Sequence, residues 1–314
     1  MKITNIAIAA GAIAVISLIP IFIKGPYVLH VICLCLIYTI CASSMRAIII
    51  SGQFPLAHGA FMGVGAYAGA LACKLLDWSP WLAIPFGGLV SMALGIVIGF
   101  PFARLRALYY AMGSLFFGIA VVNVISSFSF TGGVMGITGI PPLFTDMQTY
   151  YYFFLGLTVF CLLIIYRVEH SRIGTNLRSI AQSHLVASSV GINESFYKIF
   201  AVGFGCLFVG IAGAAYANYN QVIMPQSFGL MSTLWIAMYV LVGGVNNFAG
   251  PIIGTFILLT ITEFFRGSEM VMKYTPYISA GILLIAAYFM KGGLISLPRL
   301  VIALFSKFRI GKDG

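Results

Sequence analysis

Hydrophobic residues run through this chain in long blocks, separated by short polar or glycine-rich stretches. In hydrocarbon the backbone polar groups must be satisfied within the chain, so apolar runs of about 20 residues predict membrane-spanning helices. We therefore predict an all-α integral membrane protein, with its first apolar run kept as a helix rather than cleaved as a signal peptide. About ten transmembrane helices are expected, at residues 5–23, 27–49, 59–76, 81–103, 107–128, 149–167, 196–219, 229–245, 250–266 and 274–290.

Composition and charge agree with this pattern. Of the 314 residues 61% are hydrophobic and 8% are charged, whereas soluble domains average about 25% charged residues. The net charge of +10 indicates basic cytoplasmic loops rather than nucleic-acid binding. If both termini are cytoplasmic, the ten helices place every basic residue on the cytoplasmic side except Lys24, Lys74, Arg266 and Lys273. We therefore predict cytoplasmic N- and C-termini.

One polar interval interrupts the apolar blocks. The transmembrane domain is expected to cover residues 1–291, with this cytoplasmic segment at 168–196, and a basic cytoplasmic tail follows at 292–314. Within the segment we predict one helix from Thr175 to Val190, ended by Gly191. Asn193 is expected to cap the next helix. A short helix joined rigidly to a spanning helix can transmit a push from a partner outside the bilayer.

Glycine forms a second pattern. Small residues four apart let helices approach closely in lipid, and this spacing occurs at Gly65 and Gly69 and at Gly95 and Gly99. Two stretches share one glycine spacing and predict a possible internal repeat, as in many transporter folds. Their matched glycines are Gly52, Gly59 and Gly63 in the first and Gly243, Gly250 and Gly254 in the second.

The chain offers little catalytic chemistry. Glu263 is the one acid inside a predicted span, which makes it a candidate for a functional role, although a local ion pair with Arg266 is favoured. His58 is expected to bond a backbone carbonyl, and the six cysteines are expected to act as small packing residues. We predict a non-catalytic protein without a metal site, whose transport path is powered elsewhere.

Several motifs resemble the LivM-type permease family of branched-chain amino acid ABC importers. Q-F-P-L-A-H-G-A-F-M-G-V-G-A-Y (53–67) is similar to the family's G-Q-x-S-x-G-H-x-x-F-x-G-x-G-A-Y, and R-A-L-Y-Y-A-M-G-S-L (106–115) to its R-G-x-Y-F-A-x-x-T-L. T-G-G (131–133), S-R-I-G (171–174), G-I-N (191–193), G-I-A-G-A (210–214), G-G (243–244) and G-P (250–251) follow in the family's order.

The resemblance implies a permease subunit of the bacterial inner membrane that takes up branched-chain or other apolar amino acids. Its implied partners are a second permease, two cytoplasmic ATPases that use ATP and Mg, a periplasmic or extracellular binding protein, and the bilayer. This chain itself is expected to hold no cofactor. The implied ATPase-coupling residues are Arg178, Ser183, His184, Leu185, Ala187, Ser188 and Gly191. The residues expected to face the transport path are Gln53, Phe54, Tyr110 and Ser114.

The chain also departs from the family pattern. Its coupling segment lacks the family's acids, so docking is expected to rely on shape, apolar contact and neutral hydrogen bonds. Pro55 and Ala57 replace a serine and a glycine of the first motif, and the T-G-G loop lacks the family's acid. The alternatives left open are a permease for urea or short amides, a stand-alone secondary carrier and, third, a membrane enzyme.

Overall fold

The computed structural model describes residues 25–105, 107–265 and 281. Its long helices are α2 (Pro26–Ile49), α3 (His58–Leu75), α4 (Pro80–Phe102), α5 (Ala107–Ser127), α6 (Met147–Glu169), α9 (Glu194–Asn220), α10 (Leu230–Gly243) and α11 (Ala249–Phe265). The shorter elements are α7 (Arg172–Gln182), α8 (His184–Ser189), η1 (Ser129–Thr131), η2 (Gly133–Met135), η3 (Pro225–Phe228), β1 (Ile137–Thr138) and β2 (Val222–Ile223).

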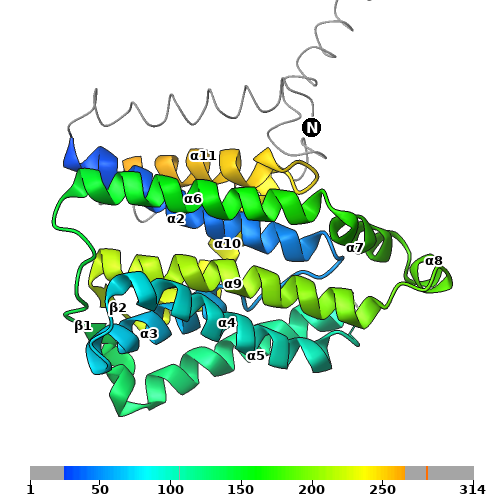
Figure 1. The fold of residues 1–314 in the computed structure, drawn as a ribbon, viewed down its shortest axis with the longest axis horizontal. Helices are drawn as coiled ribbons and strands as arrows, with labels where there is room; N and C mark the ends of the chain where they lie inside the picture. Colours follow the sequence, from blue (N-terminus) through cyan, green and yellow to red (C-terminus); the bar gives the residue numbers. More distant parts are fainter. Residues whose placement is uncertain (1–24, 106, 266–280, 282–314) are drawn as a thin grey trace, which may run out of the picture.

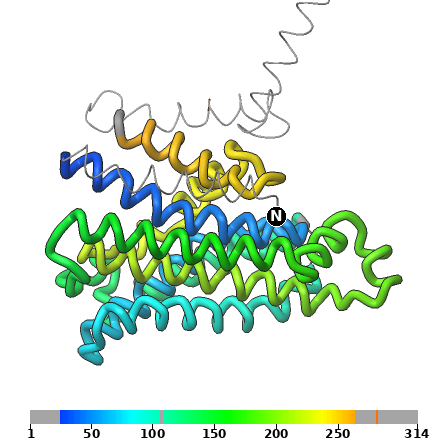
Figure 2. The backbone as a smooth tube through the Cα atoms, turned by 45° about the horizontal axis from the view of Figure 1, so that its top comes forward, coloured from blue at the N-terminus to red at the C-terminus, as the bar shows by residue number. Residues whose placement is uncertain are grey.

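The long helices lie side by side, with α7 and α8 at one end of the bundle and the β1–β2 pair at the other (Figure 1). β1 and β2 pair antiparallel at one end, with Ile137 opposite Ile223. α7 and α8 project beyond the other helices at the opposite end, as Figure 2 also shows. We call these the β-pair end and the α7–α8 end.

α9 occupies the middle of the bundle and packs against α2, α3 and α4. Glycines make these contacts close. A Cβ on Gly65 would overlap the backbone of Gly210, and a Cβ on Gly95 would lie 2.6 Å from Cys206 Sγ. These close approaches confirm the expectation that the spaced glycines mediate helix packing. Small residues allow such contacts between membrane-spanning helices. All six cysteines are buried and unpaired, as expected.

The structure confirms an all-helical, multi-pass membrane protein. Within the described residues, helices occupy eight of the expected spans, and six segments are long and apolar enough to cross a membrane. One of the six, Pro225–Gly243, consists of η3 and α10 rather than one continuous helix. The first and last expected spans, residues 5–23 and 274–290, and the tail at 292–314 lie outside the described residues, as does the pairing of Glu263 with Arg266.

Charged residues divide unevenly between the two ends. Helix directions place the described basic residues at or beyond the α7–α8 end, except for Lys74. Lys74 instead donates a hydrogen bond to the Thr138 carbonyl (3.1 Å) at the β-pair end. This distribution matches the charge asymmetry expected from the sequence.

The polar interval differs from its prediction in one respect. The expected single helix from Thr175 to Val190 is wrong, because the backbone is extended at Ser183 (φ −160°, ψ 116°) and separates α7 from α8. The expected stop at Gly191 and the expected cap at Asn193 are confirmed. Gly191 has a φ of +80° and closes α8, and the Asn193 side chain accepts a hydrogen bond from Phe196 N (3.2 Å).

Candidate functional site at the α7–α8 end

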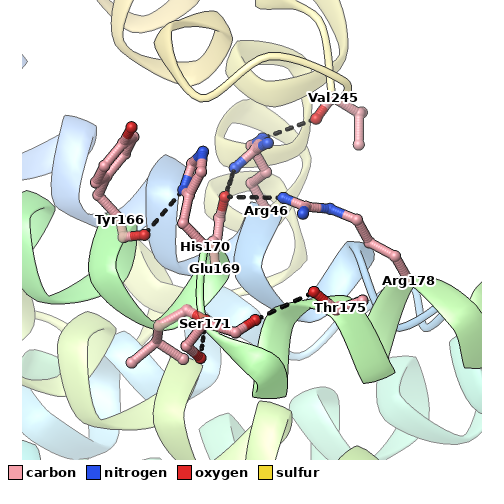
Figure 3. Close-up of polar contacts among 9 residues, drawn as sticks. Arg46, Tyr166, Glu169, His170, Ser171, Thr175, Arg178 and Val245 are labelled. Atoms are coloured by element: carbon pink, nitrogen blue, oxygen red, sulfur yellow. Dashed lines mark hydrogen bonds and ion pairs between the residues drawn. The ribbon is translucent and has the colours of Figure 1, made fainter. Parts of the chain in front are cut away.

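A buried ion pair lies where α2 and α6 end (Figure 3). Arg46 on α2 and Glu169 on α6 are only 3% and 4% exposed, and Arg46 Nη1 donates to both carboxylate oxygens. Arg46 Nε donates to the Val245 carbonyl (2.7 Å), and the guanidinium lies 5.8 Å from the centre of the Phe248 ring. Arg46 therefore joins α2, α6 and the turn between α10 and α11. A buried pair of this kind is costly to break, because either partner left alone is an unpaired buried charge.

A second arginine approaches the same carboxylate. Arg178 Nη2 on α7 lies 4.0 Å from Glu169 Oε2, and the Arg178 side chain is 44% exposed (Figure 3). Glu169 thus stands between a buried arginine of the bundle and a half-exposed arginine of the projecting helix. The closer and more buried Arg46 contact is the stronger, since exposed pairs contribute little.

The chain direction from α6 into α7 is fixed by a few residues. Ser171 caps α7 by accepting a hydrogen bond from Ile173 N (3.2 Å). A Cβ on Gly174 would overlap the Glu169 carbonyl, so this close approach requires glycine. The S-R-I-G sequence therefore turns the chain sharply enough to bring Arg178 back toward Glu169.

α7 is attached to the bundle along its inner face. Leu177 and Ile180 are buried, and Asn176 Nδ2 donates to Tyr197 OH on α9 (2.7 Å). Ala181 packs against Gly52, whose φ of +82° shapes the turn between α2 and α3. α7 therefore contacts both α9 and the α2–α3 turn.

α8 presents apolar side chains outward. Ser183 caps it by accepting a hydrogen bond from Val186 N (3.4 Å). Leu185, Val186 and Val190 are 81%, 64% and 76% exposed. We call these three residues the α8 apolar face, and it lies at the extreme tip of the projection.

A charged cluster holds the base of α8 to α9. His184 Nδ1 lies 2.9 Å from Glu194 Oε1, and Lys198 contacts the same carboxylate oxygen. Lys198 is only 3% exposed, and Glu194 is 31% exposed. Glu194 is therefore engaged within the chain, which leaves the tip itself without an acid, as the sequence indicated.

The expected coupling residues fall into two groups. Leu185, Ser188 and Gly191 are exposed, whereas Arg178, Ser183 and His184 make the contacts described above. Ala187 is the exception, because it is 2% exposed. Its expected place on the outer face beside Leu185 is wrong: residues two apart on a helix do not share a face, so Ala187 faces inward where Leu185 faces outward.

The expected path residues lie near the same end, on two elements that touch. Ser114 on α5 accepts a hydrogen bond from Leu56 N (3.0 Å), which joins α5 to the stretch that contains Gln53 and Phe54. Gln53, Tyr110 and Ser114 are 2%, 2% and 3% exposed, and Phe54 is partly buried against the core. These side chains are enclosed by their own chain, and their role in a path stays a prediction.

The burial of Arg46 was not predicted from the sequence. Arg46 counts in the sequence only as a cytoplasmic positive charge, yet it lies inside α2 and is buried. Arg46 lies before the end of the apolar run that forms α2, and this position could have indicated a buried charge that needs a partner. His58 behaves as expected, since its Nε2 lies 3.1 Å from the Cys41 carbonyl and 3.0 Å from Ser44 Oγ.

Comparison with known proteins assigns the chain to a family. The family profile described as "Branched-chain amino acid transport system / permease component" matches residues 27–288. The high-affinity branched-chain amino acid transport system permease proteins LivM of Salmonella typhimurium and of Escherichia coli K12 are both 25% identical to this chain. The matches cover 84% and 85% of this chain, respectively, and 69% of each relative.

A second kind of relative also matches. The permease protein LivH of Escherichia coli K12, from a transport system described in the same words, is 24% identical over 79% of this chain and 87% of its own length. No solved structure matches the chain. Since the family profile covers most of the sequence, the chain belongs to the permease components of branched-chain amino acid transport systems.

Proposed function

We propose that this chain is a membrane-spanning permease subunit of an ABC importer for branched-chain or other apolar amino acids. It forms the transport path together with a second, homologous permease. Matches to both LivM and LivH support such a pair, because both permeases of Escherichia coli K12 are described as belonging to a high-affinity branched-chain amino acid transport system. The proposed location is the bacterial inner membrane, with the α7–α8 end in the cytoplasm.

The projecting α7–α8 segment is the observation that carries the proposal. It lies at the end where basic residues gather, as cytoplasmic loops do. α7 is fixed to the bundle, and α8 exposes Leu185, Val186 and Val190 beyond it. A helix with an apolar outer face is suited to a hydrophobic groove on a partner.

The partner proposed for this face is a cytoplasmic ATPase subunit. ATP and Mg bind there, and hydrolysis occurs there, so this chain supplies the path and the docking helix rather than a reaction. Because the tip carries no acid, the α8 apolar face supplies the contact energy. The opposite β-pair end is then the side from which a substrate-binding protein delivers the amino acid.

Reconstitution in liposomes tests the proposal. The chain, the second permease and both ATPase subunits are combined with the binding protein, and uptake of labelled leucine is measured. We expect uptake only with internal ATP and the complete set of subunits. Uptake by this chain alone, without ATPases, would show a secondary carrier and contradict the proposal.

A further inference from the structure

Two turns at the α7–α8 end are connected to the projecting helix, the first by direct contact with α7 and the second through Arg46 and Glu169. The α2–α3 turn (residues 50–57) passes close to α7 at Gly52, where an added Cβ would lie 3.3 Å from the Ala181 Cα. The α10–α11 turn (residues 244–248) contains Val245, whose carbonyl accepts the Arg46 Nε hydrogen bond. Each turn includes a glycine with positive φ, at Gly52 (+82°) and Gly244 (+106°).

Each of these turns leads into a helix of the bundle. α3 follows the first turn and is buried along most of its length, and α11 follows the second. Gly59 N on α3 donates to Thr233 Oγ1 on α10 (2.8 Å), so the helices beside the two turns are also joined to each other. A displacement of either turn is therefore passed into the middle of the bundle.

Glu169 connects α7 to this system through two unequal contacts. The Arg46 contact is buried and uses both carboxylate oxygens, whereas the Arg178 contact is 4.0 Å long and half-exposed. Exposed ion pairs contribute little and are easily exchanged. The Arg178 contact is thus the one that a partner pressing on α7–α8 can open or close, while Arg46 stays with Glu169.

We infer that Glu169 is a positioning residue that passes movement of α7–α8, through Arg46, to the α10–α11 turn. The Ala181–Gly52 packing carries the same movement to the α2–α3 turn. This inference rests on the proposed function, since it assigns the residues by which an ATPase-driven displacement of α8 reaches the spanning helices. Arg46 acts through its Nε hydrogen bond to Val245, not by contact with substrate.

Two variants separate this role from a structural one. Arg46→Lys keeps the positive charge beside Glu169, but a single ammonium cannot keep both the bidentate pair and the Val245 bond. Arg178→Ala removes the half-exposed contact and leaves the buried pair intact. Arg172→Ala is the matched control, because Arg172 is an exposed arginine on the same helix.

The first experiment measures leucine uptake and ATP hydrolysis together in the reconstituted complex. We expect Arg46→Lys and Arg178→Ala to assemble and hydrolyse ATP like the wild type, with leucine transported per ATP reduced at least about fivefold. Arg172→Ala should keep the wild-type ratio. A wild-type ratio in both test variants, or a loss of uptake that only follows the amount of assembled complex, would overturn the inference.

The second experiment needs no partner. Hydrogen exchange of the purified chain in detergent is compared between wild type and Arg46→Lys. Faster exchange in residues 244–248, with unchanged exchange in α4, is expected. Unchanged exchange in that turn would overturn the role of Arg46 even if the complex transports leucine. Failure of the wild-type complex to transport leucine would instead contradict the proposed function.

Discussion

α7 and α8 are neighbours in the sequence, yet they face opposite surroundings. α7 buries Leu177 and Ile180 against the bundle and places Arg178 beside Glu169. α8, one residue later, exposes the apolar side chains of Leu185 and Val186. The difference arises at Ser183, where one extended residue redirects the chain. One helix is attached to the bundle, and the other leaves the apolar side chains of Leu185 and Val186 unburied.

The largest expected effect tests the attachment. Arg46→Ala leaves the Glu169 carboxylate buried without its close partner, which we expect to lower the free energy of unfolding by about 3–5 kcal/mol. Denaturation in mixed micelles measures this loss in the free energy of unfolding. Arg178→Ala, on the half-exposed side of the same carboxylate, should cost about 0–1 kcal/mol. Equal losses in the two variants would contradict the unequal roles assigned to them.

The next prediction tests which side of α8 faces inward. Ala187→Asp places a charge at a buried position, and we expect a loss of about 2–3 kcal/mol in the free energy of unfolding. The same substitution at the exposed Ser188 should leave stability unchanged. The measurement is thermal denaturation of the purified chain in detergent. Stability that falls for Ser188→Asp but not for Ala187→Asp would reverse the orientation of the helix.

A third change affects binding rather than stability. Leu185→Ser removes an exposed apolar side chain, so the isolated chain should melt as the wild type does. Its affinity for the ATPase subunit should fall by about 1–2 kcal/mol, because burying a leucine contributes about 1.5–3 kcal/mol. Titration of detergent-solubilised subunits measures this. An unchanged affinity would remove Leu185 from the interface.

The smallest effect concerns the boundary itself. Ser183→Ala removes the cap that accepts a hydrogen bond from Val186 N, and caps contribute about 1 kcal/mol. We expect faster hydrogen exchange confined to α8, with α7 unchanged. Ser183→Asn retains a capping side chain and should restore slow exchange. Equal acceleration in α7 would show that the two helices are one unit after all.

Much of the fold could be predicted from the apolar runs. In hydrocarbon the backbone N–H and C=O groups must form hydrogen bonds within the chain, and an α-helix achieves this within one segment. The cap at Gly191 and the cap at Asn193 were also predictable, since each depends on adjacent residues. The division at Ser183 was not predicted, and the contacts that hold α7 in place, to Tyr197 and Gly52, join it to residues outside the segment. Likewise, the Arg46–Glu169 pair joins residues far apart in the chain, and no local pattern relates them.

Cross-linking from the tip of α8 tests whether the α8 apolar face contacts the ATPase subunit. In a background whose native cysteines are replaced, L185C and V190C are compared with M135C, an exposed position near the β-pair end. We predict that L185C and V190C form cross-links to the ATPase subunit in the assembled complex, whereas M135C does not. Cross-linking to the ATPase from M135C, or its absence from both α8 positions in an intact complex, would contradict this prediction.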